Sequence, residues 1–273
     1  MSFRVAILGC GPTGLLAAHA CAMQNVEFEV FSKKRKSHLF GSQYLHEPIP
    51  GITNHYDKGT PVTYINRGTP EEYRRKTHGK WWDGVVAPQE FEPHHTAWNI
   101  REAYDKLWQF YGQDVNDYEI PTSKYAASLV TTDLSLDVLY DLVISTVPRT
   151  IWKVPGEEFI YSEGWAVGDA PELGRFCPFT TENDNEIVCD GTNEVSYTRL
   201  SRVFGYTTIE WPIASKPPVP GVSKITKPLH YQPSNQVNPT SEWLHVGRYG
   251  AWRKGVVVTD AWHEVTKRLK DGR

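Results

Sequence analysis

The residues with the clearest chemistry in this sequence are three glycines near the N-terminus. They belong to the hexapeptide GCGPTG at residues 9–14. At this spacing, the first glycine allows a tight turn, the second lets a pyrophosphate approach the backbone, and the third lets a helix pack closely on a strand. The pattern predicts a dinucleotide site, and we expect it to be formed by Gly9, Gly11, Pro12, Thr13 and Gly14.

Such a loop works only when a strand leads into it and a helix leads out of it. Residues 3–8 form an apolar run typical of a buried parallel strand, and residues 15–24 are rich in alanine as in a helix. Residues 26–31 predict a second strand. This order predicts a β–loop–α–β unit. The start of the helix would offer free N–H groups and positive partial charge to a phosphate.

The end of the second strand departs from the usual pattern. An acidic residue normally stands there and binds the adenosine ribose, but this chain has Ser32. Ser32 can form a hydrogen bond with a ribose hydroxyl. Together with the basic run at Lys33-Lys34-Arg35-Lys36, it could instead suit the 2′-phosphate of NADP. A third interpretation is that the basic run is a solvated loop, and the sequence leaves all three open.

A second glycine motif stands near the C-terminus. Residues 241–246 predict a last strand, Gly247-Arg248 follows, and residues 256–270 predict a helix. This order resembles the last strand, Gly-Asp or Gly-Arg step and helix of FAD proteins of the glutathione-reductase-like class. The resemblance implies that Gly247, Arg248, Trp252 and Val256 contact FAD. A similar Gly168-Asp169 pair has no helix behind it, and we interpret it as a turn unrelated to the cofactor.

Together these motifs resemble the UDP-galactopyranose mutase and amine-oxidase branch of FAD proteins. Two further segments support the resemblance: residues 40–46, similar to the mutases' flavin loop, and Tyr197-Thr198-Arg199, similar to their strand near the substrate. The resemblance implies cofactor contacts from the first of these segments and from the end of the second strand. These expected contacts are Ser32, Lys33, Gly41, Ser42, Gln43 and Leu45.

The sequence also departs from the mutases at two places. Gln43 stands where their flavin-facing histidine would be. The tyrosines and the Asp-Met-Asp run that follow their Gly-Arg step are replaced here by residues 252–258, WRKGVVV. We therefore carry over FAD binding, and we do not carry over sugar-ring contraction.

Three residues are candidates for catalysis, and each has a structural alternative. Arg199 could hold a carboxylate or phosphate with its planar guanidinium, or form an ion pair on the strand surface. His46 could line the flavin pocket or be a hydrogen-bonded core histidine. Lys254 could orient water near the flavin or lie on the surface. Trp81-Trp82 could stack on a base or sugar, or pack in the core.

Composition excludes several classes. The chain has 273 residues, 40% of them apolar and 22% charged, which argues against disorder, collagen and coiled coil. A net charge of −3 disfavours a strongly basic nucleic-acid binder, although a local basic patch stays open. We find neither an apolar run long enough to span a membrane nor a signal peptide, and therefore expect a cytoplasmic protein.

We expect no metal site. The four cysteines form no CxxC pair, and the side chains of the adjacent His94 and His95 should diverge. Cys10 and Cys21 fit buried thiols in a reducing compartment.

The predicted fold is α/β (α+β), a Rossmann-type FAD-binding domain with an inserted mixed substrate or cap layer. Residues 1–51 would form the βαβ unit and flavin loop, and residues 52–118 an inserted cap with helices at 70–78 and 96–111. Residues 119–150 would return to the nucleotide-binding sheet, and residues 151–240 would form an antiparallel substrate region. Residues 241–273 would supply the last FAD-binding strand and helix.

The resemblance implies an FAD-dependent oxidoreductase that transfers a hydride from the C–N unit of a small or nucleobase-attached amine. Two alternatives stay open: a non-redox flavoenzyme acting on a sugar nucleotide, and a nucleotide-holding protein without turnover. The expected partner is a small molecule or a modified nucleotide. A nucleic acid is left open, although the net charge does not indicate one, and the sequence says nothing about oligomeric state.

Overall fold

The computed structural model describes residues 3–33, 35–39, 44–53, 58–81, 94–120, 130–131, 134–152, 156–170, 181, 183–217, 219–233 and 243–272. The chain divides into two compact units. Unit 1 contains residues 1–37, 101–159 and 230–273, and unit 2 contains residues 38–100 and 160–229. The division falls inside two long strands, β9 (Glu158–Ala170) and β13 (Ser223–Gln232).

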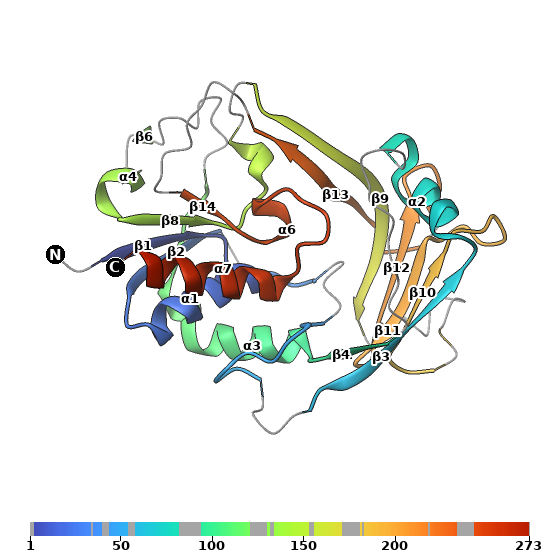
Figure 1. The fold of residues 1–273 in the computed structure, drawn as a ribbon, viewed down its shortest axis with the longest axis horizontal. Helices are drawn as coiled ribbons and strands as arrows, with labels where there is room; N and C mark the ends of the chain where they lie inside the picture. Colours follow the sequence, from blue (N-terminus) through green and yellow to red (C-terminus); the bar gives the residue numbers. More distant parts are fainter. Residues whose placement is uncertain are drawn as a thin grey trace. The chain divides into compact units, whose positions relative to one another are not determined.

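Unit 1 is built on a five-stranded parallel sheet with the order β14-β8-β1-β2-β5 (Figure 1). Its central strand consists almost entirely of buried residues, as expected of a parallel sheet that is covered on both faces. The strands are β1 (Arg4–Leu8), β2 (Glu27–Ser32), β5 (Val115–Asp117), β8 (Leu142–Ser145) and β14 (Trp243–His245).

Helices α1 (Pro12–Met23) and α7 (Val258–Asp271) lie side by side in unit 1 (Figure 1). Eight consecutive residues of helix α1, Gly14 to Cys21, are buried, so the helix is covered on all sides. Several of them are alanines, whose small side chains let neighbouring elements pack closely. The opposite face of the sheet packs against a cluster that includes Phe31, Val143 and Trp152. Unit 1 therefore has the Rossmann-type architecture that the sequence predicted.

The remaining elements of unit 1 connect these strands. They are α3 (Ile100–Tyr111), η2 (Gly112–Asp114), β6 (Val130–Thr131), β7 (Leu134–Ser135), α4 (Leu136–Leu139), η3 (Arg149–Ile151) and α6 (Gly247–Gly250). The predicted helix at 96–111 begins only at Ile100, because residues 94–97 pair with another strand in unit 2.

Unit 2 is a seven-stranded mixed sheet with the order β13-β9-β12-β11-β10-β3-β4. From β9 to β4 its neighbouring strands are antiparallel, except β10 and β3, which run parallel. Helix α2 (Pro70–His78) contacts β12, and η1 (Gly79–Trp81) follows it (Figure 1). The other strands are β3 (Thr60–Arg67), β4 (His94–Ala97), β10 (Glu186–Asp190), β11 (Arg199–Val203) and β12 (Tyr206–Pro212).

The Gly168-Asp169 pair lies inside β9 and does not form the expected turn. Gly168 has a φ of +146°, and a Cβ built on it would lie 2.5 Å from the carbonyl oxygen of Thr207. The β9–β12 register also shifts between Thr207 and Thr208. The glycine is therefore needed for close approach of two strands.

None of the helices in the described ranges is both long and apolar enough to cross a membrane.

Candidate nucleotide-binding site

The three glycines of the N-terminal loop have different surroundings. Gly9 has a φ of +103°, and a Cβ on it would lie 2.5 Å from Thr146 Oγ1. A Cβ on Gly14 would lie 1.8 Å from the carbonyl oxygen of Gly9, so this position admits only glycine. A Cβ on Gly11 would meet nothing within 4 Å. Gly9 and Gly14 therefore shape the loop, whereas Gly11 leaves open space above the backbone.

The start of helix α1 has the features of an anion site. Its N-cap is Gly11, no side chain caps it, and its first turn holds no acidic residue. Pro12 occupies the first turn, where a missing N–H costs nothing. The remaining N–H groups and the positive end of the helix dipole can therefore interact with a phosphate.

The C-terminal glycine motif lies against this helix start. Gly247 has a φ of +73°, and a Cβ on it would lie 2.7 Å from Thr13 Cγ2. A Cβ on Gly250 would lie 2.5 Å from the carbonyl oxygen of Ser145, at the end of β8. The structure thus brings together the two glycine motifs that lie more than two hundred residues apart in the sequence.

The segment after Gly247 holds the other C-terminal candidates. Arg248 is half-buried within α6. Trp252 is buried and adopts the left-handed conformation, with a φ of +50°, which is unusual for a bulky side chain. Its ring meets that of Phe159 edge-on, with centroids 5.5 Å apart. Val256 is buried, and Lys254 is half-buried in the turn before α7.

Two cations of the basic run after β2 form ion pairs with acidic residues of unit 1. The Nζ of Lys33 lies 2.9 Å from Glu119 Oε2, and Arg35 forms an ion pair with Asp105. Lys34 lies outside the described residues. Ser32, at the strand end, forms a hydrogen bond with the thiol of Cys10, whose pKa is raised by burial and only partly lowered again by that bond.

Tyr104 is a contact of the glycine loop that the sequence analysis missed. Its hydroxyl donates to the carbonyl oxygen of Cys10 at 2.8 Å and accepts from the backbone N–H of Lys36 at 3.1 Å. The ring also lies under the guanidinium of Arg35. Tyr104 therefore ties helix α3 to both the loop and the basic run. The only sequence signal was its place on the apolar side of the predicted helix.

In unit 2, the predicted flavin loop is described only in part. Gly41, Ser42 and Gln43 lie outside the described residues. Leu45 is buried, and its backbone exchanges hydrogen bonds of 2.9 and 3.0 Å with that of Trp98. His46 is exposed, and its ring contacts those of Tyr44 and His95.

These residues belong to a cluster of two histidines and two tyrosines. The hydroxyls of Tyr44 and Tyr64 are 3.0 Å apart, and the ring of His95 lies 5.1 Å from that of Tyr64. Burial raises the pKa of both tyrosines. His46 and His95, far apart in the sequence, are thus neighbours, whereas His94 is exposed. Trp82 lies outside the described residues.

Arg199 is held by a buried carboxylate in unit 2. Its guanidinium forms an ion pair with Glu210, whose other carboxylate oxygen lies 2.7 Å from the Nζ of Lys227. Burial by itself raises the pKa of Glu210, but the charges of Arg199 and Lys227 outweigh it and hold that pKa below its usual range. Arg199 and Lys227 thus both pair with the one carboxylate of Glu210.

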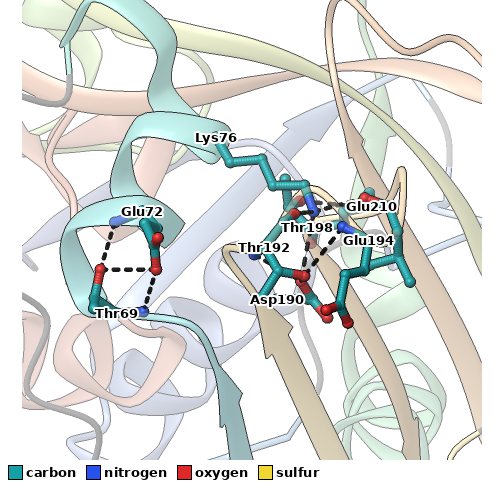
Figure 2. A network of polar contacts seen from close by, with 9 residues as sticks. Thr69, Glu72, Lys76, Asp190, Thr192, Glu194, Thr198 and Glu210 are labelled. Carbon is teal, nitrogen blue, oxygen red and sulfur yellow. Dashed lines mark hydrogen bonds and ion pairs between the residues drawn. The ribbon is translucent and has the colours of Figure 1, made fainter.

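The strand that contains Arg199 is preceded by a loop that helix α2 fixes in place. The Nζ of Lys76 donates to the carbonyl oxygens of Thr192 and Val195, at 2.6 and 2.8 Å, and lies 3.6 Å from Asp190 (Figure 2). The helix itself starts with a capping box between Thr69 and Glu72 (Figure 2).

Among the described residues, no group of three or more His, Cys, Asp or Glu side chains could hold a metal ion. Among the described residues, Cys10, Cys21 and Cys189 are buried and not in a disulfide.

The sequence matches no protein-family model and no curated protein sequence. The fold, however, is similar to solved structures. A reduced UDP-galactopyranose mutase has a TM-score of 0.53 at 11% identity, with 100% of this chain and 95% of that chain covered. A 2-methyl-3-hydroxypyridine-5-carboxylic acid oxygenase also has a TM-score of 0.53, at 12% identity, with 99% and 88% covered. At these identities the likeness establishes a shared fold.

Proposed function

We propose that this chain binds FAD and acts as an FAD-dependent oxidoreductase. The observation that carries the proposal is the contact between Gly247 and Thr13, which places the C-terminal glycine motif against the start of α1. A nicotinamide-binding βαβ unit has no need of such a contact. The open space at Gly11 and the uncapped start of α1 fit a pyrophosphate, so the residues present suit the cofactor.

In this proposal each motif has a separate task. The backbone at Gly11, Thr13 and Gly14 binds the pyrophosphate, and the segment from Gly247 to Val256 binds the flavin half, with Arg248 supplying positive charge. Trp252 forms a wall of the site. When bound, the flavin supplies the acceptor for a hydride.

The surroundings of the basic run favour FAD over NADP. A 2′-phosphate needs cations that are free to approach it. Lys33 and Arg35 are already paired with Glu119 and Asp105. Two of the four cations that the sequence offered for a 2′-phosphate are thus already in ion pairs within unit 1.

For the substrate, we propose an amine whose C–N bond is oxidised, either small or attached to a nucleobase. The substrate carbon gives up a hydride and becomes an iminium carbon, which water then hydrolyses. The planar guanidinium of Arg199 supports a substrate that also carries a carboxylate or phosphate, which it could hold with two hydrogen bonds. Within this proposal Arg199 binds that anion and His46 lines its pocket, both in unit 2. Lys254, in unit 1, has the separate task of orienting water.

A sugar-nucleotide mutase is the second candidate. The similarity to the UDP-galactopyranose mutase fold and the Tyr197-Thr198-Arg199 motif support it. The two candidates differ in electron use. An amine oxidase consumes an electron acceptor with each turnover, whereas a mutase of this kind would need reduced flavin and consume no electrons. A third candidate, a nucleotide-holding protein, would bind FAD and turn over neither substrate.

The test begins with the visible absorption spectrum and a titration of the purified protein with FAD. We expect flavin bands that bleach with a reductant. Gly11→Ala should leave the unfolding temperature unchanged, because its Cβ has room, and weaken FAD binding at least tenfold. A wild-type protein that neither contains nor takes up FAD would refute the proposal. With FAD bound, screens of amines in air and of sugar nucleotides under reduction would separate the candidates.

A further inference from the structure

Unit 1 contains a group of buried polar atoms that none of the motifs above explains. Ser145, at the end of β8, is fully buried, and its Oγ has no hydrogen-bond partner in the described part of the chain. His245, at the end of β14, is its direct neighbour in the sheet, and its Nδ1 is buried and equally unpartnered. The His245 ring stacks on that of Trp243, with centroids 5.9 Å apart.

Three more such atoms belong to the segment that follows β8. They are Arg149 Nε, Trp152 Nε1 and Glu157 Oε2. The residues are connected by contacts: the Trp152 ring meets that of Trp243 at 5.3 Å, and Arg149 Nη2 lies 3.4 Å from Glu157 Oε1. The side chains of Trp152 and Glu157 are more than nine-tenths buried.

One nitrogen of Arg149 and one carboxylate oxygen of Glu157 form hydrogen bonds with the hydroxyl of Tyr231. Arg149 Nη2 donates to the Tyr231 hydroxyl at 2.8 Å, and that hydroxyl donates to Glu157 Oε1. Burial and the neighbouring carboxylate raise the pKa of Tyr231 to about 12. Burial, followed by the charge of Arg149, lowers the pKa of His245 to about 3. The group therefore contains one cation, one anion and two neutral titratable residues.

A buried polar atom without a partner costs about 1–3 kcal/mol, and native proteins leave few of them. Five in one connected group indicate a shared partner. We propose that Ser145, Arg149, Trp152, Glu157 and His245 form a binding site for a neutral ligand that both donates and accepts hydrogen bonds. The two N–H groups of Arg149 and Trp152 require acceptors, Glu157 Oε2 requires a donor, and Ser145 and His245 can serve either way.

The charges select the class of ligand. An anion would be repelled by Glu157, and a cation by Arg149, so neither matches the set. Ordered water has the required chemistry, and so does a neutral amide or heterocycle edge. The proposal goes beyond the proposed function, because it assigns a ligand to side chains that have no role in it.

Crystals of the full chain, soaked separately in formamide, formate and methylammonium, test the proposal with three probes of similar size and different charge. We expect either ordered water or formamide within hydrogen-bond distance of at least three of the five atoms. Water alone identifies solvent as the ligand, whereas displacement by formamide identifies an organic neutral site. Binding of formate or methylammonium instead, or five atoms that contact only each other or nothing, would overturn it.

A matched pair of tryptophan variants gives a second test. Trp211 Nε1 is also buried without a partner, but it lies in an apolar cluster of unit 2 with Val167 and Ile209. If Trp152 binds a ligand, Trp152→Phe removes a hydrogen bond and should lower the unfolding temperature by about 2–4 °C more than Trp211→Phe. Equal shifts in the two variants would contradict the proposal.

Discussion

Gly247 and Thr13 are in contact, with a left-handed glycine at the end of the last strand facing the first turn of α1. A Cβ at Gly247 would lie 2.7 Å from Thr13 Cγ2. We therefore expect Gly247→Ala to weaken FAD binding at least tenfold and to lower the unfolding temperature. Gly255→Ala is the control, because Gly255 has a similar φ of +84° but open space at its Cβ. If both variants lose affinity equally, backbone strain and not this contact is responsible.

The Arg199–Glu210–Lys227 cluster predicts an asymmetric response to mutation. Glu210→Gln removes the buried negative charge that pairs with both Arg199 and Lys227, and we expect it to destabilise the fold by about 3–5 kcal/mol. Lys227→Met leaves Arg199 and Glu210 paired and should cost much less. Urea unfolding of the two variants measures the difference. Similar losses would mean that the carboxylate does not hold the cluster together.

Glu210 also predicts acid sensitivity. Because its pKa is below the unfolded value of about 4.3, its ionisation stabilises the folded state above that pH, and the contribution is lost as pH falls. The free energy of unfolding should therefore decline below about pH 4. The decline should be shallower in Glu210→Gln than in wild type, and parallel curves would contradict the assignment.

His245 predicts a pH dependence at a higher range. Its pKa is about 3 in the folded state and about 6.5 when unfolded, so the unfolded chain binds one more proton between these values. Stability should fall as pH falls through this window, by up to about 1.4 kcal/mol per unit. His245→Gln should remove that slope. His263→Gln, at an exposed position on α7, is the control and should keep it.

Replacing Lys76 should increase the mobility of the loop at residues 192–195, because Lys76 donates two hydrogen bonds to it. Lys76→Met removes two hydrogen bonds to the loop at residues 192–195 and leaves the buried Asp190 without its cation. We expect faster amide exchange at residues 191–198 and a loss of about 3 kcal/mol. Arg75→Met, which breaks an exposed pair with Glu71, should change stability by less than about 0.5 kcal/mol. Equal exchange rates in the two variants would refute the role of Lys76.

The nucleotide-binding half of the fold could be predicted because its signals are local. The apolar strand, glycine loop and alanine-rich helix follow one another within 23 residues, and the structure has them in that order. The predicted helix at 70–78 is equally local, since its capping box and Pro70 lie at its start. By contrast, residues 96–97 continued the helical pattern but belong to β4, because pairing with β3 decides their structure.

The site could be predicted only in part, for a related reason. The glycine loop could be recognised from the sequence, because the types and spacing of residues 9–14 are enough to identify it. Nothing in the sequence states that Tyr104 reaches Cys10, that His95 adjoins His46, or that Glu210 holds Arg199. Each of these depends on tertiary pairing between distant segments. The same applies to Ser145 and His245, whose neighbouring positions follow from the pairing of β8 with β14.

The order of strands in unit 1 also has a consequence for synthesis on the ribosome. β1 emerges first, yet its neighbour β8 comes more than 130 residues later, and the edge strand β14 and helix α7 come last. Apolar surface on α1 that α7 will cover is therefore available to chaperones until residues 258–271 have been synthesised. A nascent chain truncated before β14 should stay associated with a chaperone, and release should require residues 243–271.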